Sequence, residues 1–236
     1  MQDMVSFVKR EIIERMFALG AIKLNPRVPF QWASGNLMPI YNDNRLLFGD
    51  PGGKTLIMKG FKLLTAQQEI SFDFVAGVAT AGIPPSTLFG YLKEKKTGYV
   101  RDKPKAHGMK NRIEGITDCG FQGERVLVIE DLVSFGGSSA DAVQAVRDMG
   151  GVVDYCLCIF SYGLDEASEV FAGSRPYNKD GAKLKQPCTL LPLVTYADVI
   201  NYAEQQQKFS PIEISMLREW REDPTQWQYI HGHTAV

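Results

Sequence analysis

The sequence predicts an α/β protein with a central, mostly parallel sheet flanked by helices. The first observation is that short apolar runs of strand character alternate with helix-like segments between residues 54 and 162. Such alternation requires crossover connections, which place helices on both faces of a parallel sheet. The second is that the chain has 236 residues, 44% of them hydrophobic, which suffices for a single domain spanning 1–236 with its own core.

The N-terminal part precedes the alternating pattern. Residues 4–19 predict an amphipathic helix, because apolar residues recur at spacings of three and four and Gly20 can end the helix. Residues 21–45 are rich in proline, asparagine and aromatic side chains and predict short strands and turns. A second helix is expected over residues 54–69.

The alternating segments follow, and a polar C-terminal part completes the chain. Strands are expected at 72–78, 97–101, 125–131 and 152–162, with helices after Pro84 and Pro85 and near 138–149. The polar stretch 174–187 predicts an exposed insertion. One short strand and two helices, near 197–207 and 211–222, are expected after it.

Charge and composition exclude several classes of partner. The net charge of −1 provides no overall basic field for nucleic acid. Apolar runs are too short to span a bilayer, and the N-terminus lacks a signal-peptide pattern, so a soluble cytoplasmic protein with no membrane partner is expected. The four cysteines have no C-x-x-C spacing and predict reduced structural thiols.

One stretch, residues 126–142 (VLVIEDLVSFGGSSADA), combines a buried strand with chemistry at its end. Ligands of parallel sheets collect at the carboxyl ends of the strands, so Glu130 and Asp131 are expected to emerge there. The residues that follow combine hydroxyl donors with small residues, which let backbone N–H groups approach an anion; they are Ser134, Phe135, Gly136, Gly137, Ser138 and Ser139.

Carboxylates beside a phosphate cradle need an explanation, because like charges repel. A vicinal diol provides one, since two carboxylates can accept hydrogen bonds from adjacent sugar hydroxyls while a 5′-phosphate lies on the helix N-terminus. Magnesium shared with the ligand would also reduce the repulsion. The stretch lacks the spacings of a Walker A loop or a dinucleotide fingerprint and instead fits a ribose 5-phosphate.

This stretch resembles the phosphoribosyl-diphosphate binding motif of the type I phosphoribosyltransferases. Phe135 stands where a small residue, usually Thr, is found in that family. The resemblance implies the family's fold: a core at about 50–170, and a small hood built from about 1–45 and C-terminal elements. The polar insertion at about 174–187 lies outside the resemblance, which otherwise extends from about residue 30 to 227.

A basic segment precedes this motif. Residues 93–112 carry eight Lys or Arg against two acids on a nearly neutral protein. Within it, R-x-K-x-K-x-H-G at 101–108 is similar to the catalytic loop of the orotate phosphoribosyltransferase branch. The resemblance implies that Arg101, Lys105 and His107 contact the diphosphate across a homodimer interface. Lys103 stands where an acid is common, and Asp102 where many members have Lys.

Three further segments are similar to the same branch. Residues 76–84 (AGVATAGIP) resemble its diphosphate loop, which assigns Thr80 and Ala81 to the sugar diphosphate, although some members have Lys at the second position. Residues 32–45 resemble a segment near the base and ribose, with Ala33 in place of a frequent Lys. The candidates for contact with orotate are Ser134, Tyr41, Asn42 and Tyr162. Tyr162 is included because FSYG at 160–163 lacks an Arg that some members use to hold orotate, which leaves Tyr162 or backbone groups for that role.

The expected reaction is transfer of ribose 5-phosphate from phosphoribosyl diphosphate to orotate, with Asp131, Arg101, Lys105 and His107 as the catalytic set. Mg²⁺ is expected as cofactor, held mainly by the substrate rather than by protein ligands. Two alternatives remain. One is a phosphoribosyltransferase for a purine base, and the other is a non-catalytic sensor of the sugar diphosphate, which Ala33, Ala81 and the absent Arg near Tyr162 would suit.

Overall fold

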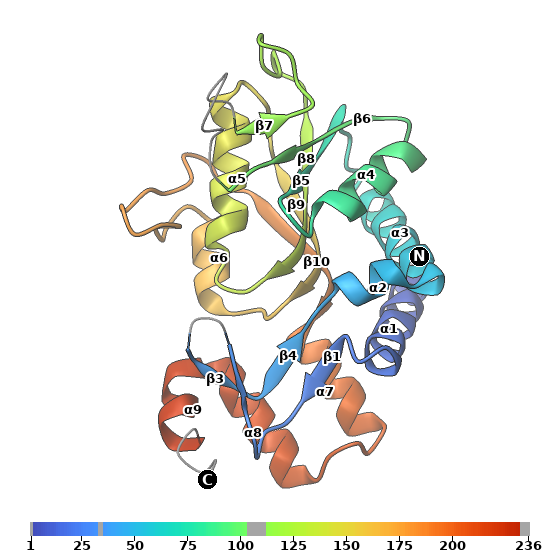
Figure 1. Ribbon diagram of the computed structural model, residues 1–236, viewed down its shortest axis with the longest axis vertical. Coiled ribbons are helices and arrows are strands. Elements are labelled where there is room, and N and C mark those ends of the chain that lie inside the picture. Colours follow the sequence, from blue (N-terminus) through green and yellow to red (C-terminus); the bar gives the residue numbers. More distant parts are fainter. Residues whose placement is uncertain (1, 33–34, 103–111, 232–236) are drawn as a thin grey trace.

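The structure is a computed structural model and describes residues 2–32, 35–102 and 112–231 (Figure 1). Its centre is a six-stranded sheet in which neighbouring strands are parallel except at one edge, where β7 is antiparallel to β6. In spatial order the strands are β10 (Thr189–Thr195), β9 (Tyr155–Ser161), β8 (Val126–Val133), β5 (Phe74–Val78), β6 (Lys96–Val100) and β7 (Ile113–Glu114). The predicted mostly parallel sheet is therefore confirmed.

The two faces of the sheet bury separate cores. Along β8, Val126 and Val128 belong to one hydrophobic cluster and Leu127 and Ile129 to the other, as the alternation of side chains in a strand requires. Helices α5 (Gly137–Asp148) and α6 (Asp165–Phe171) cover the first face (Figure 1). The second face is covered by α1 (Gln2–Ala18), α3 (Pro51–Gln67), α4 (Ile83–Leu92) and α7 (Tyr196–Gln205).

Segments from both ends of the chain form a smaller layer below the sheet in Figure 1. It contains two antiparallel strand pairs and two helices: β1 (Ile22–Leu24) with β4 (Ile40–Asn42), β2 (Phe30–Gln31) with β3 (Leu37–Met38), α8 (Pro211–Glu222) and α9 (Pro224–His231). Trp220 is buried at its centre, where the indole Nε1 lies 2.9 Å from Sδ of Met38 and the ring contacts Trp32 and Tyr162.

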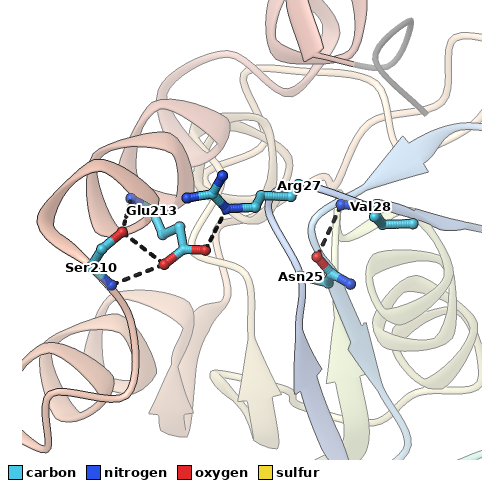
Figure 2. A network of polar contacts seen from close by, with 5 residues as sticks. All are labelled: Asn25, Arg27, Val28, Ser210 and Glu213. Carbon is cyan, nitrogen blue, oxygen red and sulfur yellow. Dashed lines mark hydrogen bonds and ion pairs between the residues drawn. The ribbon is translucent and has the colours of Figure 1, made fainter. Parts of the chain in front are cut away.

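A polar network fastens the N-terminal part of this layer to α8 (Figure 2). Ser210 caps α8, and its side chain and backbone N–H both bond the carboxylate of Glu213. Arg27 reaches across to donate to the same carboxylate at 2.7 Å and holds the pKa of Glu213 at about 2. Asn25 orders the intervening turn by accepting a hydrogen bond from the N–H of Val28.

The sequence predicted the long helices, the central strands and the short strands of residues 21–45, but it missed three short helices. Helix α8 has the predicted bounds, whereas the second helix begins at Pro51 rather than residue 54 because Asp50 caps it. Helices α2 (Arg45–Gly49), α6 and α9 were not predicted, since they are too short to show a clear periodicity. None of the helices in the described part of the chain has the length and apolar character that a membrane crossing requires.

Candidate active site

The two acids of the motif lie within β8, where its pairing with β5 has ended. The pairing of β5 with β8 stops at Gly77 and Ile129, whereas the pairing of β9 with β8 continues to Val133. The strand was expected to end at Asp131; β8 runs two residues further, to Val133, because β9 still supplies partners. The acids are nevertheless at the carboxyl edge of the sheet, beside the end of β5.

Their side chains have different environments. Asp131 is half-buried, whereas Glu130 is 6% exposed. The Glu130 carboxyl accepts hydrogen bonds from the backbone N–H of Asp131 at 2.9 Å and from Oγ of Ser139 at 3.2 Å. Burial, followed by its interaction with Asp131, raises the pKa of Glu130 to about 9. A direct bond from Glu130 to ribose stays a prediction; its contacts indicate a role in positioning Asp131 and α5.

The raised pKa predicts how stability depends on pH. A folded chain keeps the Glu130 proton up to about pH 9, whereas the unfolded chain releases it near the ordinary value of 4.5. The free energy of unfolding therefore falls as pH rises between these values. We expect the thermal midpoint of the wild type to fall more steeply from pH 6 to pH 8.5 than that of Glu130→Gln. Parallel pH curves of the two proteins would contradict this.

The loop after β8 presents backbone donors. Only Ser134, Phe135 and Gly136 separate the strand from α5, and Gly136 adopts φ +82°, a conformation that glycine reaches without strain. Among the described residues, no side chain caps the N-terminus of α5. Its first N–H groups, at Gly137 and Ser138, therefore remain available to an anion, as a phosphate cradle requires. Ser139 is buried against Glu130 and is not part of that exposed surface.

The predicted diphosphate loop lies directly beside the acids. It connects β5 to α4, and Gly82 lies so close to β8 that a Cβ there would be 2.5 Å from the carbonyl oxygen of Ile129. Thr80 is exposed and Ala81 half-buried at this edge. The fold thus brings residues from two separate stretches of the sequence, 76–84 and 126–142, to one edge of the sheet.

The basic segment is described only at its two ends. Lys103, Lys105 and His107 lie outside the described residues, so their predicted contacts stay predictions. Arg101 and Arg112 are joined by two hydrogen bonds. The backbone N–H of Arg101 donates to the carbonyl oxygen of Arg112 at 2.8 Å, and Nε of Arg112 donates to the carbonyl oxygen of Arg101 at 3.1 Å. Arg112 also makes two hydrogen bonds to Asp141 of α5, at 2.6 and 3.2 Å. The pair Arg101 and Arg112 is therefore tied to α5.

The predicted base side is formed by β4 and the residues after it. Tyr41 is 39% exposed, whereas the amide atoms of Asn42 are buried and have no hydrogen-bond partner among the described residues. A residue that the sequence analysis missed, Asn44, is fully buried and donates to the carbonyl oxygen of Asp131 at 2.8 Å. Asn44 lies beyond β4, immediately before α2, with helical backbone angles (φ −66°, ψ −14°), so no strand alternation in the sequence indicated its role.

Tyr162 is mainly a core residue. It is 2% exposed, and its ring packs against Trp32, Phe160 and Trp220 with centroid separations of 5.1 to 5.5 Å. Burial and then the nearby Asp131 raise the pKa of its hydroxyl. Contact of Tyr162 with orotate stays a prediction, and because the ring is packed against these neighbours, the hydroxyl is the group that would make it.

Comparison with known proteins decides the family. No protein-family model matches the chain. It is 36% identical over 219 residues to the orotate phosphoribosyltransferase of Streptococcus pneumoniae serotype 2 (strain D39 / NCTC 7466), which covers 93% of this chain and 97% of the relative. The chain belongs to the orotate phosphoribosyltransferase family.

Further orotate phosphoribosyltransferases agree with this assignment. That of Listeria monocytogenes serovar 1/2a is 36% identical over 220 residues, covering 93% of this chain and 98% of the relative. The crystal structure of orotate phosphoribosyltransferase from Aeropyrum pernix matches with a TM-score of 0.64 at 25% identity, over 84% of this chain and 99% of that one. The predicted family, type I phosphoribosyltransferase fold and enzyme class are confirmed. The roles of individual residues remain predictions.

Proposed function

We propose that the chain transfers ribose 5-phosphate from 5-phospho-α-D-ribose 1-diphosphate to N1 of orotate, giving orotidine 5′-phosphate and diphosphate in pyrimidine biosynthesis. The observation that carries this is the single sheet edge where Asp131, the uncapped N-terminus of α5 and the loop at Thr80 meet. Donors for a phosphate and an acceptor for sugar hydroxyls there fit a phosphorylated ribose.

Each part of the edge has a role in this reaction. The N–H groups at the start of α5 bind the 5′-phosphate, and Asp131 accepts from the ribose hydroxyls. Displacement at the anomeric carbon passes through an oxocarbenium-like state, so the enzyme must fix geometry and stabilise the leaving group. Arg101, Lys105 and His107 supply positive charge to the departing diphosphate. Tyr41 and Asn42 contact orotate together with Ser134.

Magnesium fits this arrangement as an ion held mainly by substrate. Groups of three or more His, Cys, Asp or Glu side chains able to hold a metal ion do not occur within the described residues. Asp131, half-exposed at the sheet edge, is the carboxylate that would hold the ion together with substrate oxygens. When bound, Mg²⁺ neutralises charge on the diphosphate.

The active protein is proposed to be a homodimer that works in the cytoplasm. The resemblance of residues 101–108 to the family's catalytic loop implies that this segment acts on the partner's site. The four cysteines are unpaired, which suits a reducing compartment. Light scattering coupled to size exclusion tests the assembly, and a fully active monomer would contradict it.

The assay follows the ultraviolet absorbance of orotate after phosphoribosyl diphosphate and Mg²⁺ are added. Loss of orotate absorbance, with formation of diphosphate, is the expected result. Adenine, guanine and hypoxanthine serve as alternative acceptors, and turnover of one of these in place of orotate would favour a purine enzyme. Binding of the sugar diphosphate without turnover of any base would favour the sensor.

A further inference from the structure

Residues 174–187 form an exposed segment, here called the strap, that runs along α5 (the orange loop beside α5 in Figure 1). Within it, Asn178 orders the tip by accepting from the N–H of Ala182, and the N–H of Tyr177 donates to the carbonyl of Ala182. Leu184 is the one buried side chain of the strap and joins the core below α5. The strap is therefore an ordered hairpin with an apolar anchor.

The strap is fastened to the C-terminal half of α5. Arg147 donates to the carbonyl oxygens of Gln186 at 2.5 Å and Pro187 at 2.8 Å. Lys185 makes an ion pair with Asp148 at 3.0 Å, and its N–H donates to Gln144 at 3.3 Å. These bonds fix one end of the strap relative to the helix axis.

The other end of the strap abuts the first turn of the same helix. A Cβ built on Gly137 would lie 2.7 Å from the carbonyl oxygen of Tyr177 and 3.8 Å from its carbonyl carbon. Gly137 has no unusual φ, so the backbone conformation itself does not require glycine there. Close approach of the strap is thus what excludes a side chain at the residue that opens α5.

Tyr177 of the strap also lies near Arg112, at the C-terminal end of the basic segment. The Tyr177 side chain is half-buried against the core below α5. Its hydroxyl has a raised pKa, caused first by burial and then by Asp141 and Asp148, with Arg112 opposing them. Asp141 is the carboxylate that binds Arg112, so Tyr177 lies near the ion pair that ties α5 to Arg112.

We propose that the strap is a positioning element for substrate phosphate: by pressing Tyr177 against Gly137 while anchored at Arg147, it sets where the first N–H groups of α5 point. This rests on the proposed function, because it assumes that these N–H groups bind the 5′-phosphate. The strap itself touches no reacting atom.

The test compares the full chain with a trimmed chain in which residues 175–182 are replaced by two glycines. Two residues are enough to close the gap, because the two sides of the strap are already close: a Cβ on Gly173 would lie 2.9 Å from the carbonyl oxygen of Leu184. Trimming is expected to weaken ribose 5-phosphate binding, measured by calorimetry, by about tenfold, since small misplacements of donors are costly. KM for phosphoribosyl diphosphate should rise similarly, and KM for orotate by less than about twofold.

Gly137→Ala distinguishes the contact from a general loss of stability. In the full chain it should weaken ribose 5-phosphate binding by about tenfold, because the added Cβ clashes with the Tyr177 carbonyl. In the trimmed chain, which lacks that carbonyl, the loss should be at most about twofold. Lys179→Ala, at the exposed tip, is the matched control and should bind as the wild type does. If the trimmed chain does not fold, Pro176→Gly with Tyr177→Gly loosens the same carbonyl at full length.

Equal losses from Gly137→Ala in both backgrounds, or unchanged ribose 5-phosphate binding in the trimmed chain, would overturn the role of the strap. Failure of the wild type to bind ribose 5-phosphate would instead overturn the proposed function, and the strap's role with it.

Discussion

Replacing Lys105 with alanine is expected to reduce kcat by about 10²- to 10³-fold, the usual effect of losing one preorganised donor to developing charge. Negative charge on the diphosphate grows as its bond to the anomeric carbon breaks, so a cation placed there stabilises the transition state more than the bound substrate. The dissociation constant of phosphoribosyl diphosphate should therefore change much less than kcat. Steady-state kinetics and calorimetry measure the two quantities separately.

Lys95→Ala is the matched control for this change. Lys95 is an exposed lysine of the same basic segment. It lies directly before β6 and outside residues 101–108, which resemble the family's catalytic loop. Its replacement should leave kcat unchanged. If Lys105→Ala instead weakens sugar-diphosphate binding and turnover equally, Lys105 contributes only ground-state binding. That result would favour a sensor over an enzyme.

The part of the site that the sequence predicted best is encoded in one contiguous stretch. Residues 126–142 supply a strand, a short loop and a helix N-terminus, so their relative positions depend mainly on local geometry. The placement of Leu127 and Val128 on opposite faces of the sheet, and the free donors after Gly136, follow from strand period and helix capping alone. A pattern read along the chain is sufficient for such a unit.

The parts that could not be predicted depend on contacts between distant segments. Asn44 reaches the carbonyl of Asp131 across 87 positions, and no local pattern indicates that pairing. Glu130 and Asp131 look equivalent in the sequence, yet the packing of α5 through Ser139 buries only the first. The strap looked like a simple exposed insertion because its anchors, Arg147 and Gln144, belong to a helix that the sequence does not place beside it.

The loop that carries Thr80 and strand β8, which carries Asp131, lie against each other at Gly82. Gly82 is the N-cap of α4, and a Cβ there would be 2.5 Å from the carbonyl oxygen of Ile129 and 2.6 Å from that of Val78. Both obstacles are backbone atoms of buried strands, so neither can move aside as a flexible side chain could. Only glycine allows the loop that carries Thr80 to lie against the strand that carries Asp131.

Gly82→Ala is therefore expected to lower the free energy of unfolding by about 3 kcal/mol, at the upper end for overpacking, because no neighbour can yield. Any protein that still folds should also bind ribose 5-phosphate poorly, because the added methyl group forces the loop that carries Thr80 away from β8. Urea unfolding and calorimetry measure the two effects. Gly49→Ala is the control: a Cβ there meets nothing within 4 Å, so stability should stay within about 1 kcal/mol of the wild type. If Gly82→Ala is as stable as the wild type and binds ribose 5-phosphate as tightly, the loop that carries Thr80 does not have to lie this close to β8.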